Sequence, residues 1–445
     1  MARVVLGMLG FGTVGTGVVR LLAQQHHLVL KKIAVQNLAK HRDVHPPCTM
    51  TTNAGEVLDD PEIEIVVEVM GGEQPALDYI RRAIEKRKHV VTANKEVLAK
   101  HGPELFEKAR KRGVAIFFEA SVAGGVPLIS TIHKGLEANE ISSVAGILNG
   151  TTNFILSSME EKGEDFGQAL KQAQALGFAE ADPTNDVEAY DVAYKLSILS
   201  ALAYGKFVKP QDIYRQGITK LTADDITHAR EFGYRVKLIG STRAKGDRLA
   251  VRVHPTLVPL SHPLSTVSGS NNGIVVNGHA VGELMMVGPG AGQMPTASAV
   301  VGDIINLASA LQLPDFASYF QTAIEPEWAQ TSHPGDWVCP YYLRLEVADS
   351  PGVIGQIGTI FGEHGVSIRS IVQREAEGGG ATIVILTHSV ENSSMDKATA
   401  ELSKRPFLRQ LSSCVRIYQP VQPAAESADA PAADKKSEAP VCTPR

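Results

Sequence analysis

The side chains best suited to acid–base chemistry in this chain of 445 residues are a lysine and the series of carboxylates that precedes it. Residues 180–195 read EADPTNDVEAYDVAYK. We expect one helix, entered at Asp182-Pro183, on which Asp191 and Lys195 stand four residues apart and meet on one face. Glu188 is expected on the same face. A lone pair with this spacing is usually only a solvated ion pair, so the rest of the chain has to decide its role.

A glycine-rich turn near the N-terminus predicts a dinucleotide site. Residues 3–9 read as a short buried strand, and GFGTVG at 10–15 follows it directly, ahead of an apolar helix. Between a strand and a helix, G-x-G-x-x-G is a fairly strong sign of this site. Gly10 permits the tight turn, Gly12 lets the backbone approach a pyrophosphate, and Gly15 allows helix and strand to pack closely. The helix N-terminus would hold the phosphates. A glycine turn without a ligand is the alternative.

The second strand bears on which nucleotide is bound. An NAD site usually has an acidic residue after this strand, where its carboxylate accepts from the ribose 2′-hydroxyl. Here the strand at 33–36 ends in Gln36-Asn37, and the cations Lys40 and Arg42 follow. With no carboxylate to repel a 2′-phosphate, NADP(H) is favoured over NAD(H). The alternative is that Lys40 and Arg42 are ordinary basic residues of the surface, which are common.

Strands and helices alternate through the next part of the chain. The expected elements are strands at 63–70 and 89–91 and helices at 76–87 and 96–112. This order predicts a parallel sheet wound with helices, in which ligands lie beyond the carboxyl ends of the strands. Thr92, Asn94 and Lys95 follow one such strand, so we expect them to face the nicotinamide side of the cleft.

Several motifs carry a resemblance to a known family. The chain resembles the homoserine dehydrogenases, which interconvert L-aspartate 4-semialdehyde and L-homoserine on the route to threonine and methionine. The matching stretches occur in order over most of residues 1–330: GFGTVG at 10–15, TANK at 92–95, EASVAGGVP at 119–127, LNGTTNFIL at 148–156, the 180–195 segment, and GPGAG at 288–292.

The resemblance implies specific catalytic roles. Lys195 matches the lysine that acts as acid/base and protonates the carbonyl oxygen as hydride arrives. Asp191 matches the carboxylate that holds substrate and lysine in register, and Lys95 matches a second lysine at the junction of cofactor and substrate. A free lysine is a poor acid near neutrality, with a pKa of about 10.4. Burial would lower the pKa of Lys195 and Asp191 would raise it, and the sequence leaves the balance open.

The resemblance also implies binding residues. Those for the substrate are Glu180, which would grip the ammonium group, with Gly177, Asp186 and Asp191. Those for the cofactor are Gly10, Gly12, Thr13, Val14, Gly15, Thr92, Lys95, Gly290 and Gly292. A site for a monovalent cation, Na⁺ or K⁺, built largely of backbone carbonyls, would lie at Glu119, Val122, Gly124 and Val126. Two positions depart from the family pattern: Ala189 stands where glycine is usual, and Gln36 where arginine is frequent.

A separate module begins after Trp337. Its expected elements are strands at 342–347, 366–371, 382–387 and 414–418 and helices at 354–363 and 395–402. This βαββαβ order is ferredoxin-like, and with DSPGV at 349–353 it resembles an ACT domain, a small amino-acid-sensing module. The resemblance implies feedback inhibition by L-threonine at a dimeric ACT interface, through Asp349 and Gly352. A dimerisation module without a ligand is the alternative.

The expected fold class is therefore α/β, with three domains. A Rossmann-type doubly wound nucleotide-binding domain spans 1–130, with 296–325 returning to it. An α+β catalytic and dimerisation domain spans 131–300, and the ACT domain spans 340–420. The alanine-, proline- and charge-rich tail at 421–445 is expected to be disordered. We expect a homodimer or homotetramer.

Composition limits the other classes. The chain is 44% hydrophobic and 20% charged with a net charge of −5, which gives no electrostatic reason to expect nucleic acid. Neither a signal peptide nor an apolar run long enough to span a membrane is evident, so we expect a cytoplasmic protein. The four cysteines are widely spaced and predict neither a disulfide framework nor a metal site.

Two rival functions remain at this stage. A non-catalytic amino-acid sensor would need only the C-terminal module and would leave Lys95, Asp191 and Lys195 unexplained. An acylating semialdehyde dehydrogenase would need a cysteine nucleophile in the cleft. Cys48 falls in a polar loop after the second strand, and the other cysteines lie beyond the catalytic region.

Overall fold

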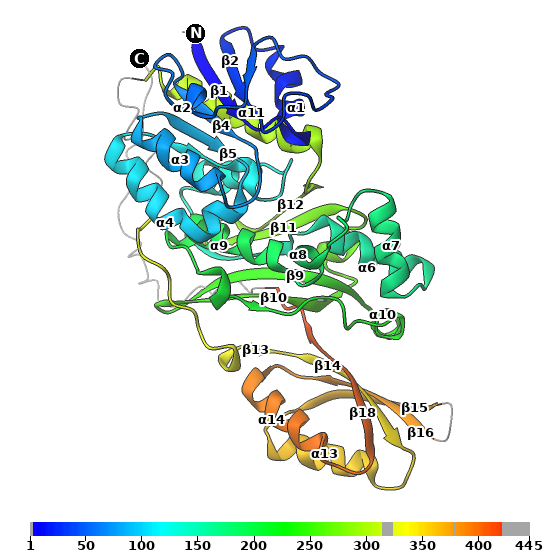
Figure 1. The fold of residues 1–445 in the computed structure, drawn as a ribbon. Helices are drawn as coiled ribbons and strands as arrows, with labels where there is room; N and C mark the ends of the chain where they lie inside the picture. The colour runs from blue at the N-terminus through cyan, green and yellow to red at the C-terminus, as the bar shows by residue number, and fades with distance from the viewer. Residues whose placement is uncertain (1–2, 314–323, 377–379, 421–445) are drawn as a thin grey trace, which may run out of the picture.

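The computed structural model describes residues 3–313, 324–376 and 380–420. It has three parts that follow one another along the molecule (Figure 1): a nucleotide-binding sheet, a central sheet, and a C-terminal module at the far end. No helix in these described ranges is long and apolar enough to cross a membrane. The expected tail at 421–445 and part of the expected return segment, 314–323, lie outside the described residues.

The N-terminal part is a six-stranded parallel sheet of order β3-β2-β1-β4-β5-β6. The strands are β1 (Val4–Leu9), β2 (Leu28–Ala34), β3 (Thr49–Thr51), β4 (Ile65–Glu68), β5 (His89–Thr92) and β6 (Ile116–Phe117). Successive residues of β1 alternate between the cores on its two faces, as Leu6 and Met8 pack on one side and Leu9 on the other. Burial on both faces requires helices on both faces, and the prediction of a doubly wound α/β domain is confirmed.

Helices cover each side of this sheet. One side carries α1 (Thr13–Leu22) and α11 (Gln293–Ala310), and the other carries α2 (Gly55–Leu58), α3 (Ala76–Glu85) and α4 (Lys95–Arg112). Because α11 packs on α1, a segment from late in the chain completes the first domain. At Gly17 of α1, an added Cβ would lie 2.7 Å from the Cβ of Ala297 on α11.

The central part is built on a mixed sheet whose strands continue into the C-terminal module. The order is β12-β11-β7-β9-β10-β18-β14-β16-β15, with β8 beside β10. The central strands are β7 (Ile141–Ile147), β8 (Tyr214–Arg215), β9 (Tyr234–Lys245), β10 (Arg248–Pro259), β11 (Asn271–Gly278) and β12 (Gly282–Pro289). The helices that accompany them are α5 (Leu128–Ser130), α6 (Gly150–Lys162), α7 (Phe166–Ala175), α8 (Thr184–Val187), α9 (Tyr190–Tyr204) and α10 (Ala223–Glu231).

The C-terminal module has the predicted ferredoxin-like arrangement. Its elements in chain order are β14 (Tyr341–Ala348), α13 (Val353–Glu363), β15 (Ile368–Ala376), β16 (Gly380–Thr387), α14 (Asn392–Leu402) and β18 (Leu408–Ile417). The strands are antiparallel neighbours in the order β18-β14-β16-β15, and both helices pack on one face (Figure 1). A short pair, β13 (Val338–Cys339) with β17 (Val390–Glu391), lies beside it.

One expected element is wrong: the single helix expected after Asp182-Pro183 is two helices, α8 and α9. The chain leaves α8 at Glu188 and enters α9 through Ala189, which is fully buried in the left-handed region at φ +63°. Glu188 therefore does not share a helical face with Asp191, and its carboxylate accepts from Thr219 Oγ1 instead (2.9 Å). The left-handed residue also accounts for the family's usual glycine at this position, because glycine adopts that conformation without a steric cost.

Candidate active site

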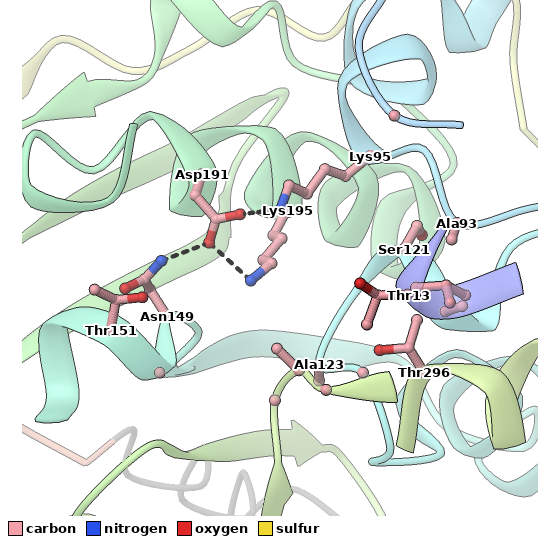
Figure 2. Close-up of a pocket in the computed structure, with 18 of the residues that line it drawn as sticks. Thr13, Ala93, Lys95, Ser121, Ala123, Asn149, Thr151, Asp191, Lys195 and Thr296 are labelled. Atoms are coloured by element: carbon pink, nitrogen blue, oxygen red, sulfur yellow. Dashed lines mark hydrogen bonds and ion pairs between the residues drawn. The ribbon is translucent and has the colours of Figure 1, made fainter. Parts of the chain in front are cut away.

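A cavity of about 640 Å³ lies beyond the carboxyl ends of β1, β4 and β5, between the first domain and the central sheet. Figure 2 shows Lys95, Asp191 and Lys195 together on one wall, with Thr13 of α1 and Thr296 of α11 across the cavity. This is the place at which ligands bind in wound parallel sheets. The helix α9, which carries Asp191 and Lys195, comes from the central domain, so the cavity needs both domains to form.

Asp191 lies between the two lysines. Its Oδ2 accepts from the Lys195 ammonium at 2.8 Å, and its Oδ1 forms an ion pair with Lys95 Nζ at 2.5 Å (Figure 2). Lys195 also donates to the carbonyl oxygen of Leu148, at 2.6 Å. The side chain of Lys195 is 9% exposed, whereas that of Lys95 is 42% exposed.

The pKa values of the two lysines shift in opposite directions because a different effect dominates at each of them. Burial lowers the pKa of Lys195, and the charge of Lys95 adds to this, against the opposing charge of Asp191. The negative charge of Asp191 raises the pKa of Lys95. Burial acts to raise the pKa of Asp191, but the two ammonium charges outweigh it and hold that pKa below its ordinary value. Lys195 is therefore the better proton donor and acceptor near neutrality, and burial decides the balance that the sequence left open.

Asn149 belongs to the site, although its role was missed from the sequence. Its side-chain amide donates to Asp191 Oδ2 at 2.9 Å and to Asp186 Oδ1 at 2.6 Å. Its oxygen accepts from the Thr152 N–H at 2.8 Å and so caps α6. The LNGTT stretch gives a signal for the cap, because asparagine is a favoured N-cap residue. The sequence gives no signal for the two carboxylate contacts.

Glu68 is a second residue that was missed. It ends β4, is fully buried, lines the cavity, and accepts from Thr92 Oγ1 at 2.6 Å and from the Met70 N–H at 2.8 Å. Burial raises its pKa. The Thr92 side chain is consequently turned towards Glu68 and does not line the cavity as we expected.

The other expected residues divide into two groups. Those that line the cavity are Gly12, Thr13, Val14, Lys95, Gly124, Gly177, Asp186, Asp191, Lys195, Gly290 and Gly292. Those outside its lining are Gly10, Gly15, Thr92, Glu119, Val122, Val126 and Glu180. Glu180 is exposed, and its backbone carbonyl accepts from Gln174.

The glycine-rich turn fits a dinucleotide. A Cβ at Gly10, which has φ +98°, would lie 2.7 Å from the carbonyl oxygen of Val69, and one at Gly15 would lie 2.8 Å from that of Gly10. At Gly12 nothing lies within 4 Å of an added Cβ, so a side chain there would fill the space that a phosphate needs. Gly12 is also the N-cap of α1 and provides no capping side chain, which leaves the helix N-terminus for an anion.

The expected cation residues lie on the loop that follows β6. Both carboxylate oxygens of Glu119 accept backbone N–H groups, from Ile129 and from Ser130, at 2.8 Å each. The Glu119 side chain thus holds the start of the next helical segment. A cation on this loop would have to be coordinated mainly by backbone carbonyl oxygens, which is the type of ligand that Na⁺ and K⁺ take in the site implied by the resemblance.

The wound parallel sheet, its glycine-rich turn and the buried lysine beyond the strand ends define a Rossmann-type, dinucleotide-binding oxidoreductase. Family models match three stretches of the chain: "Homoserine dehydrogenase, NAD binding domain" at 10–119, "Homoserine dehydrogenase" at 127–305, and "ACT domain" at 341–407. The chain belongs to the homoserine dehydrogenase family, and homoserine dehydrogenase function follows from that membership.

Relatives and solved structures agree with this assignment. The homoserine dehydrogenase of Synechocystis sp. is 42% identical over 93% of this chain and 99% of its own length. A crystal structure of a homoserine dehydrogenase from Thiobacillus denitrificans has a TM-score of 0.88 and 40% identity, covering 95% of this chain and 99% of its own. A hyperthermophilic archaeal homoserine dehydrogenase, solved in complex with NADPH, has a TM-score of 0.60 and 27% identity over 71% of this chain and 99% of its own.

Proposed function

We propose that the chain interconverts L-homoserine and L-aspartate 4-semialdehyde with NADP(H), with Lys195 as the acid/base. The observation that carries the proposal is the buried Lys195 ammonium, held by Asp191 and Leu148 on the wall of the dinucleotide cavity. An ammonium group has three N–H donors, and the described residues accept two of them. The third is available to a substrate oxygen.

The proton chemistry follows from these contacts. In the oxidation of homoserine, neutral Lys195 takes the proton of the substrate hydroxyl as the carbon–hydrogen bond breaks. In the reverse direction its ammonium gives that proton to the carbonyl oxygen. A bound nicotinamide would accept or supply the hydride. Lys95 remains charged because Asp191 raises its pKa, and it would stabilise negative charge on the oxygen.

The remaining carboxylates would recognise the amino-acid part of the substrate. Asp186 lines the cavity, and Asn149 holds it beside Asp191. An ammonium group could pair with Asp186, and with Glu180 once the exposed Glu180 side chain turns inward. The cation at Glu119, Val122, Gly124 and Val126 is proposed to order the loop that carries Gly124, which lines the cavity.

The preference for NADP(H) rests on the end of β2. Gln36 and Asn37 follow the strand, and no carboxylate stands there. The Arg42 guanidinium lies over the Phe11 ring at 5.3 Å and donates to the Asn37 carbonyl at 2.8 Å. Arg42 is thereby held beside the glycine-rich turn, where a ribose 2′-phosphate would be placed. The archaeal relative solved with NADPH supports the same preference.

We further propose that L-threonine inhibits the enzyme through the ACT domain, in a homodimer or homotetramer. Gly352 has φ +89° and is the N-cap of α13, and Gln373 on β15 donates to Asp349 at 3.0 Å. These residues place backbone N–H groups and a carboxylate at one end of the module, where the two charged groups of an amino acid could be bound.

The test is turnover of L-homoserine with NADP and with NAD, each with and without L-threonine, in the wild type and in Lys195→Ala. We expect NADP-dependent turnover that threonine suppresses, and a loss of about 10²–10⁴-fold in kcat for the variant, as for a lost general acid/base. Nucleotide binding, followed by NADPH fluorescence, should remain. Retention of a tenth of the wild-type activity by the variant would contradict the role of Lys195.

A further inference from the structure

A second cavity lies where the C-terminal module joins the central sheet. Its volume is about 420 Å³, and its walls come from β9, β10, the residues around β13 and the end of β18. β10 and β18 pair over only two residue pairs, Thr256 with Arg416 and Leu257 with Ile417. This cavity shares no lining residue with the dinucleotide cavity.

Two arginines line this cavity without a carboxylate partner among the described residues. Arg252 comes from β10 and Arg416 from β18, and Arg416 is only 8% exposed. Arg416 Nη2 donates to Asn392 Oδ1 at 2.6 Å, but its Nε and the Nη1 of Arg252 are buried and have no hydrogen-bond partner in the described part of the chain. A buried charge without a counter-charge or full hydrogen bonding is costly, so an anion beside these nitrogen atoms would stabilise them.

Aromatic rings fix both guanidinium groups. Arg252 lies over the Trp337 ring at 4.7 Å and Arg416 over the Tyr214 ring at 5.1 Å, and these two rings meet edge to face at 5.4 Å. Such stacking orients a guanidinium and leaves its N–H edge free to bind. The two cations are therefore held in place before any ligand arrives.

The rest of the lining adds little negative charge. Arg243 and Lys245 are exposed members of the lining, and the buried His254 contributes no charge of its own near neutrality, because burial and the two arginines lower its pKa. Asp336 is the one acidic residue among those that line the cavity, and it is exposed. The described lining thus carries an excess of positive charge at a place that two domains share.

We propose that this cavity binds a small oxyanion, through a carboxylate or a phosphate group, between the guanidinium groups of Arg252 and Arg416. Guanidinium groups bind both oxyanions in a two-pronged geometry, and the volume lies within the range of small-molecule sites. Each arginine belongs to a different domain. A bound anion would connect β10 to β18 and favour the arrangement of the ACT module that brings both arginines together.

The experiment is calorimetric titration of the full chain with sodium phosphate and, separately, with sodium succinate, at an ionic strength held constant with KCl. We compare the wild type with Arg252→Gln, Arg416→Lys and Arg248→Gln. Arg248 lies at the start of the same strand β10 but outside the cavity lining, and is the matched control. We expect one probe to bind the wild type, and both cavity variants to weaken it at least about tenfold, as for lost charged hydrogen bonds. The control should bind as the wild type does.

The probe that binds more tightly distinguishes phosphate from carboxylate chemistry. The proposal is overturned if neither probe binds up to about 10 mM, beyond the millimolar range of weak sites. It is also overturned if all four proteins bind equally. Light scattering on the same samples measures the oligomeric state. If Arg252→Gln dissociates an oligomer while no anion binds, the cluster pairs with a carboxylate of a second copy and the proposal fails. Because Arg252 is partly exposed, its variant remains informative even if the Arg416 variant does not fold.

Discussion

At the scale of single residues, the environment of Lys195 predicts how turnover depends on pH. In the proposed role of Lys195, oxidation needs the neutral amine, so its kcat should rise as the pH passes the pKa of Lys195, which burial places below its ordinary value of 10.5. Reduction needs the ammonium, so its kcat should fall over the same interval. Pre-steady-state hydride transfer in both directions measures this.

Asp191→Asn tests the cause of this pH dependence. The charge of Asp191 raises the pKa of Lys195, and removing that charge should move the inflection of both profiles to lower pH. Asp191→Glu, which keeps the charge, is the control and should move it much less. An inflection that stays in place or moves to higher pH in the asparagine variant would contradict this effect of Asp191 on Lys195.

Two variants of Asn149 separate its capping of α6 from its positioning of Asp186 and Asp191. Asn149→Ala removes the cap of α6, at a cost of about 1 kcal/mol in the free energy of unfolding, together with the contacts to Asp186 and Asp191. Asn149→Ser keeps a capping oxygen but has no amide donor. We expect both variants to lose kcat by about tenfold, as for a lost hydrogen bond to a charged group. Only the alanine variant should lose stability in urea denaturation. Full activity in the serine variant would leave Asn149 with a structural role alone.

At the scale of elements, the break between α8 and α9 sets the direction of the helix that carries Asp191 and Lys195. A left-handed alanine costs about 1–2 kcal/mol. Glycine at position 189 would remove that cost but would lose about 0.5–1 kcal/mol of backbone entropy and about 0.8 kcal/mol of methyl burial. We therefore expect Ala189→Gly to change the free energy of unfolding by less than about 1 kcal/mol, and Ala189→Val, branched and fully buried, to lower it by more than about 2 kcal/mol. Denaturant titration measures both, and a stable valine variant would contradict the strain argument.

The elements show how far the sequence could predict this molecule. The strand, glycine turn and helix around Gly10–Gly15 and the order of the ACT module were predictable, because periodicity and local turn chemistry determine them. The contacts of Asn149 and Glu68 were not, because each joins side chains on elements that only the tertiary fold brings together. The break at Ala189 was hidden because alanine favours helix, and packing overrides that preference.

At the scale of the whole molecule, two of the contacts between the ACT module and the central part show how the module is held. One is the short pairing of β10 with β18, which no sequence pattern indicated, since the strands lie far apart in the chain. The other joins Arg344 on β14 to Asp225 on α10, with both Arg344 Nε and Nη2 at 3.1 Å from Asp225 Oδ1. Arg344 is 8% exposed and Asp225 3% exposed, so this ion pair is buried between the two parts.

The buried pair predicts that stability and regulation are linked. Arg344→Met would leave Asp225 buried without its cation, which costs about 3–5 kcal/mol. Part of this cost should be recovered by detachment of the module, because detachment exposes Asp225 to water. We expect a lower Tm and weaker threonine inhibition, with kcat for homoserine largely kept, since the dinucleotide cavity shares no residue with this contact.

The same helix provides the matched control. Arg374 on β15 forms an ion pair with Glu231 of α10 at 2.8 Å, but both side chains are substantially exposed. Exposed pairs contribute about 0–1 kcal/mol, so Arg374→Met should leave Tm and threonine inhibition almost unchanged. Differential scanning calorimetry gives the Tm of the two variants, and inhibition curves give their response to threonine. If Arg344→Met loses stability but keeps full inhibition, the threonine signal passes through β18 and β10 alone, and the ion pair only fastens the module in place.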